Sequence, residues 1–212
     1  GAGHRRLSNH VEHRANLAAL LACGVDAVLS FTVCGAVDPD AEPGSLVVFD
    51  DLHFPSNRLP DGSLCTWYAA PGGPRRGHWI FDRPFCEPLR QVLIDAAAHA
   101  GAPVIARGTY GHVDGPRFNT RSEIAALAAA GVTAVSQTAG PEVVLAGEAE
   151  LPMALVGFVT DYANAVTATP EPVAALLARM AASTGVFSAL AERALPQITD
   201  LPPVGVVHRF EP

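Results

Sequence analysis

The sequence predicts an α/β fold. Apolar runs rich in β-branched residues alternate with stretches of helical periodicity along most of the 212 residues, which is typical of strands and helices that share one sheet. Hydrophobic residues make up 49% of the chain and charged residues 17%, which is enough apolar material for a sizeable core. The 19 glycines and 18 prolines indicate that many of the connections are tight turns.

The elements of the first half can be placed because each apolar run ends at glycine, proline or paired aspartates. Cys34 lies in a strongly apolar stretch, and we expect it to be buried. The order predicted is a helix over 14–23 with Gly24 as its C-cap, a strand over 26–32, a turn of small residues over 34–36 and a strand over 45–49.

The second half continues the alternation, with Pro141 expected at the first position of a helix and Gly185 expected to bend the longest one. The elements predicted are helices over 87–100, 122–130, 141–150 and 170–194, and strands over 104–113, 132–137 and 152–160, followed by a short proline-rich tail from Leu201.

Residues 52–84 interrupt this pattern with many prolines and with large aromatic residues that include Trp67, Tyr68, Trp79 and Phe81. A loop of this length in a compact domain is often a functional lid or an interface arm. The aromatic residues favour an interface over disorder. The alternative is a flexible proline-rich loop without a role.

Composition also restricts the partners and the compartment. The net charge of −7 and the lack of a basic face argue against nucleic acid as a partner. The four cysteines include no Cys-x-x-Cys pair, so we expect neither a metal site nor a disulfide framework, and a reducing cytoplasmic setting. No run of 18 apolar residues and no signal peptide is present, so we expect no membrane partner.

One corner of the predicted fold suggests a ligand site. The stretch GTYGHVDGPRFNTR, residues 108–121, reads as a strand, a Gly115-Pro116 turn and the start of a helix. Phe118 and Asn119 then offer a flat ring beside an amide that both donates and accepts, which suits a heteroaromatic base. The alternative is a plain turn with Phe118 in the core.

Polar residues end three further predicted strands: Thr32, the pair Gln137-Thr138, and the pair Thr160-Asp161. If the sheet is largely parallel, these ends and the Phe118 corner face one crevice. The threonine hydroxyls can bind an anion, and partial burial would raise the pKa of Asp161 and make it an acid or an acceptor. The alternatives are ordinary strand-end threonines and an N-cap or turn aspartate.

These residues carry a resemblance over residues 4–198. The runs GTYGHVDGPRFNTRSE and QTAGPEVVLAGEAELPMALVGFVTDY resemble the trimeric purine nucleoside phosphorylase family, nearest to its 5′-methylthioadenosine phosphorylases. The runs VEHRANLAALLACGVDAVL, TVCGAVDPDAEPGSLVVFDD and RPFCEPLRQVLIDAA fit as well. The resemblance implies one nucleoside phosphorylase-like domain over 1–212, with a twisted mixed sheet or partial barrel flanked by helices.

The resemblance also implies phosphorolysis of a purine nucleoside such as 5′-methylthioadenosine or a related 5′-deoxy nucleoside. Phosphate is then the co-substrate, no cofactor is needed, and a homotrimer shares its active sites between subunits. By position, Thr32 and Thr138 match phosphate-binding threonines, and His4 matches a histidine just after a phosphate-binding Arg-His pair. The residues expected to take part in catalysis are Asp161 and Thr138.

The remaining matched residues surround the nucleoside. Phe118 matches the aromatic that packs on the purine, Asn119 the position that discriminates bases, and Asp161 the aspartate that meets N7 in adenine-type enzymes. Other positions match the sugar pocket: the backbone of Val33, Gln137 beneath the ribose, His78 lent to the neighbouring subunit's 5′ pocket, and Val173 and Leu176 as the apolar wall of that pocket.

The sequence departs from the family pattern at both ends of the site. Asp161-Tyr162-Ala163 stands where the methylthioadenosine enzymes have Asp-Tyr-Asp, Asn119 replaces a serine, and Gln137 replaces a methionine. The family's first strand, its Gly-rich phosphate loop and the Arg-His pair are absent from this sequence. Either this sequence lacks the protein's natural N-terminus, or the protein has lost tight phosphate binding. Besides a phosphorylase, two alternatives therefore stay open: a phosphate-independent nucleosidase, and a nucleoside-binding relative without catalysis.

Overall fold

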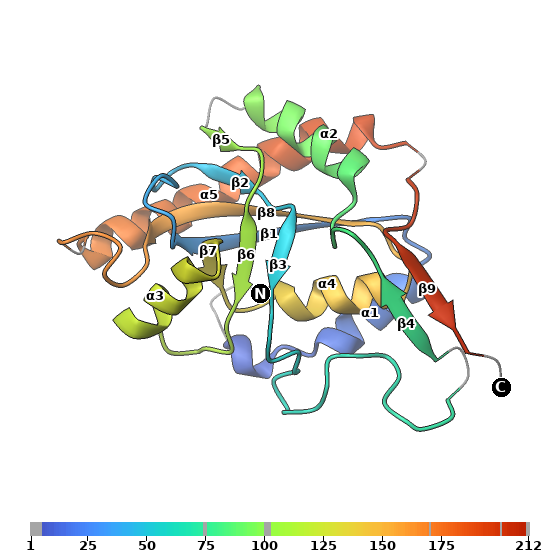
Figure 1. The fold of residues 1–212 in the computed structure, drawn as a ribbon. Coiled ribbons are helices and arrows are strands. Elements are labelled where there is room, and N and C mark those ends of the chain that lie inside the picture. The colour runs from blue at the N-terminus through green and yellow to red at the C-terminus, as the bar shows by residue number, and fades with distance from the viewer. Residues whose placement is uncertain (1–5, 74–75, 100–102, 170, 200, 211–212) are drawn as a thin grey trace.

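The computed structural model describes residues 6–73, 76–99, 103–169, 171–199 and 201–210. A seven-stranded mixed sheet lies between two layers of helices (Figure 1). The predicted α/β class, with a mixed sheet flanked by helices, is confirmed.

The sheet has the strand order β3-β6-β7-β1-β8-β2-β5. The pairs β1–β8, β3–β6, β6–β7 and β2–β5 are parallel, whereas β1–β7 and β2–β8 are antiparallel. The strands are β1 (Val28–Ala36), β2 (Leu46–Val48), β3 (Asp51–His53), β5 (Val104–Ile105), β6 (Thr109–His112), β7 (Val132–Ser136) and β8 (Met153–Tyr162).

Helices cover both faces of the sheet, and this explains the apolar character of its central strand. In β8 every residue from Met153 to Thr160 is buried, as expected for a strand covered on both sides. The helices α1 (His13–Ala22) and α4 (Ala139–Glu148) cover one face, and α2 (Glu87–Ala98) and α5 (Val173–Ala194) cover the other (Figure 1). The remaining helix, α3 (Arg121–Ala129), packs beside β7.

A second, two-stranded sheet joins β4 (Gly77–Ile80) to β9 (Val206–Arg209) in antiparallel pairing. Trp79 connects this small sheet to the rest of the protein. Its indole N–H donates to the Val204 carbonyl at 2.7 Å, and its ring packs on Gly147 of α4. The strand β3 begins at Asp51 and runs into the 52–84 stretch, β4 lies within that stretch and β9 in the tail, and the sequence did not predict them. Each is short and pairs with a partner far away in the chain.

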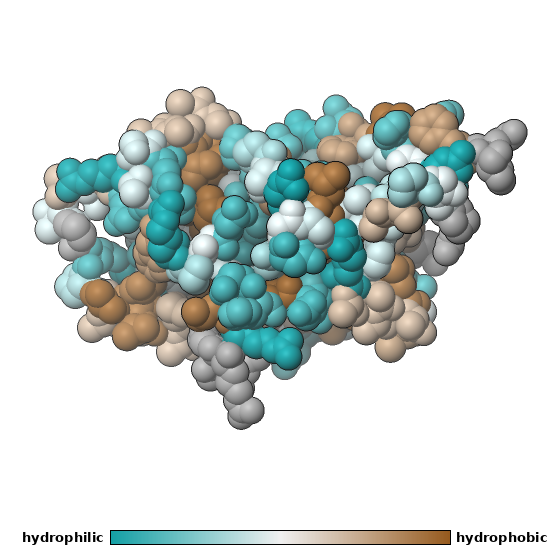
Figure 2. Space-filling view, turned by 90° about the horizontal axis from the view of Figure 1, so that it is seen from below, coloured by the Kyte–Doolittle hydropathy of each residue, from teal (hydrophilic) through white to brown (hydrophobic). Residues whose placement is uncertain are grey.

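The irregular part of residues 52–84 is held against the helices on the lower face of Figure 1. Arg14 of α1 donates to the carbonyls of Thr66 and Leu64, and Trp67 donates to the Leu145 carbonyl of α4 at 2.7 Å. These contacts contradict the alternative of a flexible loop. Seen from below, this face carries mostly hydrophilic residues with smaller hydrophobic areas among them (Figure 2).

Several predicted boundaries were wrong. Residues 34–36 continue β1 instead of forming a turn, and α5 runs without a break through Gly185. The expected strand over 104–113 is two strands, because the residues between them bond to the side chains of Arg90 and Asp50. Helix α4 begins at Ala139, so Pro141 is at its third position.

Helix α5 and the turn after it, Val173–Gln197, are long and apolar enough to cross a membrane by length and composition alone, with a mean hydropathy of 1.6 over the best window. Only 11% of that window is buried. The helix nevertheless lies along β8, β1 and α2, where it covers one face of the sheet. Its exposed residues include several alanines and two large apolar side chains, Val173 and Leu177.

Two helical glycines allow a test of the Trp79 contact. A Cβ at Gly147 would overlap the indole ring of Trp79, whereas a Cβ at Gly185 meets nothing within 4 Å. We expect Gly147→Ala to lower the free energy of unfolding by about 1–3 kcal/mol, because the ring is held by its bond to Val204. The matched variant Gly185→Ala should raise it by about 0.5–1 kcal/mol. Urea denaturation measures both, and equal effects would contradict the contact.

Candidate active site

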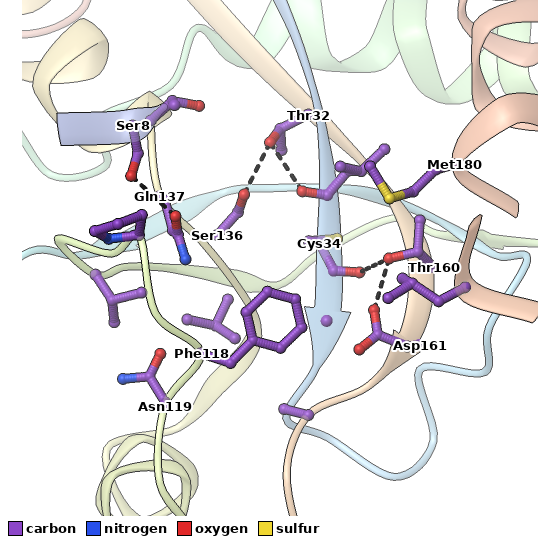
Figure 3. Close-up of a pocket in the computed structure, with 18 of the residues that line it drawn as sticks. Ser8, Thr32, Cys34, Phe118, Asn119, Ser136, Gln137, Thr160, Asp161 and Met180 are labelled. Carbon is purple, nitrogen blue, oxygen red and sulfur yellow. Dashed lines mark hydrogen bonds between the residues drawn. The ribbon is translucent and has the colours of Figure 1, made fainter. Parts of the chain in front are cut away.

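A cavity of about 600 Å³ opens where β1, β7 and β8 meet the corner before α3 (Figure 3). Its walls come from segments far apart in the chain, including residues 6–11 and α5. The predicted site residues that line it are Thr32, Val33, Phe118, Asn119, Gln137, Thr138, Asp161 and Leu176.

The directions of β1 and β7 explain how these residues come together. The arrangement differs from the prediction, which placed Thr32 at a strand end. Thr32 lies in the middle of β1, not at the end of a strand. Because β7 runs antiparallel to β1, with Gly35 opposite Val135, the C-terminal end of β7 leads back along β1 toward Thr32. The Thr32 and Ser136 hydroxyl oxygens are therefore 3.1 Å apart (Figure 3).

One wall of the cavity, here called the hydroxyl wall, is formed by the hydroxyls of Thr32, Ser136 and Thr138 and by the start of α4. Thr32 is buried, and its hydroxyl donates to the Val33 carbonyl at 3.0 Å. Thr138 is the N-cap residue of α4, and its side chain makes no capping hydrogen bond there. The N-terminus of a helix carries partial positive charge and favours an anion. This wall can bind an anion through neutral donors.

The corner at 115–120 forms the opposite side. Phe118 is 65% exposed and lines the cavity, so the alternative that placed it in the core is wrong. Gly115 has a φ of +64°, and a Cβ there would overlap the side chains of Gln137 and Ser8. Only glycine suits both the conformation and the space.

Glu123 holds this corner in place. Its carboxylate pairs with Arg117, accepts from the Thr120 N–H at 2.7 Å and lies 3.4 Å from the Asn119 amide nitrogen. Thr120 accepts in return from the Glu123 N–H, which completes a capping box at the start of α3. Hydrogen bonding to Arg117 lowers the pKa of Glu123 to about 2. The ring of Phe118 and the amide of Asn119 are thus presented on a fixed loop.

Asp161 lies near the end of β8, so the alternative of an N-cap aspartate is wrong. One of its carboxylate oxygens accepts from the Thr160 hydroxyl at 2.7 Å (Figure 3). Burial raises the pKa of Asp161, and the nearby Glu171 adds to this, while Thr160 and Arg179 oppose it. The predicted direction of the shift is confirmed. A carboxyl group of this kind can donate a proton to a ring nitrogen.

Two predicted site residues within the described part of the chain lie elsewhere. Val173 is 69% exposed at the start of α5 and does not line the cavity. His78 lies on β4 and packs edge-on against Phe210, with ring centroids 5.3 Å apart. His4 lies outside the described residues.

The sequence did not identify several residues of the cavity. Ser8 donates to the Gln137 side chain at 2.9 Å, and Asn164 donates to the Asn119 carbonyl at 2.6 Å. No local sequence pattern marks Ser8 or Asn164, because both contacts join distant parts of the chain. Ser136 ends a strand and could have been found by the reasoning that found Thr138. Among the described lining residues, Arg6 is the cationic side chain.

A buried polar cluster lies beneath the hydroxyl wall. His13 Nδ1 is 4.0 Å from a Glu142 oxygen, and the Ser30 hydroxyl donates to the other Glu142 oxygen at 3.0 Å. Burial lowers the pKa of His13 to about 4 and raises that of Glu142, so His13 is neutral at pH 7. Across the described residues, no group of three or more His, Cys, Asp or Glu side chains is arranged to hold a metal ion.

The chain is similar to several known proteins. The sequence pattern of the family described as the Phosphorylase superfamily matches residues 7–196. Over 167 residues the chain is 35% identical to a 6-oxopurine nucleoside phosphorylase of Pyrococcus furiosus, covering 77% of this chain and 62% of that protein. It is 39% identical over 169 residues to an S-methyl-5′-thioadenosine phosphorylase of Mycobacterium tuberculosis, covering 79% of this chain and 59% of that protein.

Solved structures are similar as well. The methylthioadenosine phosphorylase of Schistosoma mansoni in complex with adenine superposes with a TM-score of 0.82 at 28% identity, covering 93% of this chain and 74% of that one. The chain spans about three fifths of the length of the two curated relatives.

The buried histidine beneath the site predicts a pH dependence of stability. The pKa of His13 is lowered from 6.5 to about 4 in the folded protein, so the unfolded chain binds the proton first as pH falls. The contribution of neutral, buried His13 to the free energy of unfolding is complete above pH 6.5 and is lost as the pH falls toward 4. At 1.36 kcal/mol per pKa unit, this loss amounts to up to about 3 kcal/mol.

We therefore expect His13→Gln to flatten the decline in the free energy of unfolding between pH 7 and pH 4, measured by urea denaturation. His10→Gln, at an exposed position, is the matched control. A decline as steep in His13→Gln as in the unsubstituted protein would contradict the prediction.

Proposed function

The chain belongs to the Phosphorylase superfamily, and from that premise we propose that it is a purine nucleoside phosphorylase. We further propose 5′-methylthioadenosine or a related 5′-deoxy purine nucleoside as its substrate. The observation that carries the proposal is one cavity in which an exposed aromatic ring and a protonatable aspartate face hydroxyls at a helix start.

The proposed reaction exchanges one bond at the anomeric carbon for another. A phosphate oxygen forms a bond to C1′ while the bond from C1′ to N9 breaks, and the purine leaves with the bonding electron pair. The products are the purine base and a 5-substituted ribose 1-phosphate. The protein must therefore hold the phosphate beneath the sugar and stabilise charge on the purine.

In this proposal the hydroxyl wall binds the phosphate. The hydroxyls of Thr32, Ser136 and Thr138 supply neutral donors, and the N-terminus of α4 adds favourable partial charge. Arg6 at the edge of the cavity supplies a full positive charge.

Asp161 acts on the base in this proposal. Its protonated carboxyl donates to N7 as the glycosidic bond breaks, so the purine leaves neutral and Asp161 becomes a carboxylate. The raised pKa supports this role, because it keeps the proton available closer to neutral pH. Phe118 packs on the purine ring, and Asn119 faces its edge, where its amide can serve a 6-oxo or a 6-amino group.

The sugar end is apolar. Val33, Leu176 and Met180 line the cavity there, which suits a 5′-deoxy or 5′-alkylthio group better than a hydroxyl that needs a partner. We propose that the protein is a homotrimer in which His78 of one subunit completes the 5′ pocket of its neighbour. Its place on β4, away from its own cavity, is compatible with this.

The direct test is to incubate the purified chain with methylthioadenosine, methylthioinosine, adenosine and inosine, with and without phosphate. We expect base release that depends on phosphate and yields the sugar 1-phosphate, fastest with the 5′-methylthio nucleosides. Base release that ignores phosphate would identify a nucleosidase instead. Nucleoside binding without turnover would identify a non-catalytic relative.

The role of Asp161 predicts a pH profile. Because the protonated form donates to N7, kcat/KM for methylthioadenosine should fall as pH rises through the raised pKa of Asp161. Asp161→Asn cannot transfer a proton, so kcat/KM should drop by about 100-fold or more and this pH limb should vanish. Asp51→Asn, an exposed position on β3, is the matched control. An unchanged pH limb in Asp161→Asn would refute the role.

A further inference from the structure

The end of β8 that carries Asp161 is joined to α5 by a side chain that does not line the cavity. Arg179, in the second turn of α5, donates through its guanidinium to the Thr160 carbonyl at 3.0 Å. The same guanidinium pairs with both carboxylate oxygens of Glu171, with one of these bonds at 2.9 Å. The two side chains are 29% and 33% exposed, so water only partly surrounds the pair.

Thr160 connects this ion pair to Asp161 in two ways. The Thr160 carbonyl and the Asp161 nitrogen belong to one planar peptide group, so Arg179 holds the backbone from which the Asp161 side chain projects. The Thr160 hydroxyl also donates to the Asp161 carboxylate at 2.7 Å (Figure 3). Thr160 itself is buried. Hydrogen bonds therefore link Glu171, Arg179, Thr160 and Asp161 without a gap.

The helix end of this link lies within the apolar part of the cavity wall. Leu176, three residues before Arg179, and Met180, directly after it, both line the cavity. A bond from Arg179 to the end of β8 therefore limits how far this part of α5 can move from Asp161. In the proposed function these are the sugar end and the base end of the same substrate.

The ion pair also brings two opposite charges close to the Asp161 carboxyl. Burial is the largest cause that raises the pKa of Asp161, Glu171 adds to it, and the Thr160 hydroxyl and Arg179 oppose it. The charges of Glu171 and Arg179 thus act on Asp161 in opposite directions. Removing one of them should leave the effect of the other unbalanced.

The other titratable or charged groups around Asp161 come from different elements. Cys34 on β1 keeps its thiol proton, because burial raises its pKa. Tyr162 follows Asp161 on β8, and its hydroxyl donates to the Pro39 carbonyl at 3.4 Å. Arg6 lines the same cavity from the segment before α1.

We propose that Glu171 and Arg179 are positioning residues for Asp161. Arg179 holds the Thr160–Asp161 end of β8 against α5, and the pair places one negative and one positive charge beside the carboxyl group. This inference rests on the proposed function for the role of Asp161 as the acid. It assigns neither Glu171 nor Arg179 a contact with the substrate.

The test removes one charge of the pair at a time and measures the pH profile of kcat/KM for methylthioadenosine. In Arg179→Met, Asp161 should keep its proton to higher pH, so the descending limb should move to higher pH. In Glu171→Gln the limb should move to lower pH. Both variants break the same ion pair, so a merely structural role would change the two profiles alike. Limbs that stay in place or move in the same direction overturn the proposal.

A second ion pair provides matched controls. Arg209 on β9 pairs with Glu150, with similar exposure, and also donates to a backbone carbonyl, that of Val207 at 3.5 Å. Neither Arg209 nor Glu150 lines the cavity. Arg209→Met and Glu150→Gln should leave the limb where it is in the unsubstituted protein, and limbs that move as they do in the Glu171 and Arg179 variants overturn the proposal.

Arg179→Lys separates charge from hydrogen bonding. It keeps the positive charge, so its limb should stay close to that of the unsubstituted protein, and a limb displaced as far as in Arg179→Met overturns the proposal. At low pH, where Asp161 is protonated in every variant, Arg179→Met should still lower kcat/KM by about fivefold to tenfold, because the bond to Thr160 is lost. An unchanged kcat/KM there overturns it as well.

Carbon-13 NMR titration of the Asp161 carboxyl, assigned by its absence from Asp161→Asn, gives a readout that needs no turnover. If the chain shows no turnover but the titration moves to higher pH in Arg179→Met and to lower pH in Glu171→Gln, the positioning role stands and the proposed reaction falls. If the chain turns over and neither titration moves, the reaction stands and the positioning role falls. If neither is seen, both fall.

Glu171→Gln covers the case in which Arg179→Met does not fold. It replaces a partly exposed carboxylate by an amide of the same shape and leaves the bond from Arg179 to Thr160 in place. The Asp161 titration in this variant must still move to lower pH, and an unmoved titration overturns the proposal.

Discussion

The antiparallel contact between β1 and β7 is the constraint on which the cavity depends. The parallel pair β1–β8 forms the buried centre of the sheet, and a sheet of parallel strands alone would place its polar groups beyond the strand ends. Because β7 reverses direction against β1 at Gly35 and Val135, it brings Ser136 back beside Thr32, within the length of β1. The start of α4 then follows directly at the cavity wall.

Much of this arrangement could be predicted from the sequence, because local patterns determine it. The alternation of apolar strands and helices gave the α/β class, and polar residues after apolar runs identified Thr138 and Asp161. The sheet order could not be read in this way, since the reversal of β7 depends on pairing between residues 100 apart. Thr32 was therefore identified for an incorrect reason: it was taken as a strand end, and the structure places it inside β1.

The residues that the sequence missed share a physical cause. Ser8 and Asn164 contribute through single hydrogen bonds across the cavity, and no periodicity or motif marks such a bond. Short strands such as β4 and β9 are stable only when paired with each other, so neither can be recognised from its own sequence pattern.

The balance of charge in the cavity explains why the order of its hydroxyls matters. Among the described lining residues, one arginine at the edge supplies positive charge, and the buried wall is made of neutral groups. Neutral donors bind an anion well only when they already point at it, since turning a hydroxyl away from a buried acceptor costs a hydrogen bond. Thr32, whose hydroxyl donates to the Val33 carbonyl at 3.0 Å, gives up that bond when it turns to an anion, so part of this cost falls on Thr32. Burial is the largest influence on the pKa of Asp161 and raises it against the opposing effects of the Thr160 hydroxyl and Arg179, which keeps the acid form available for the base.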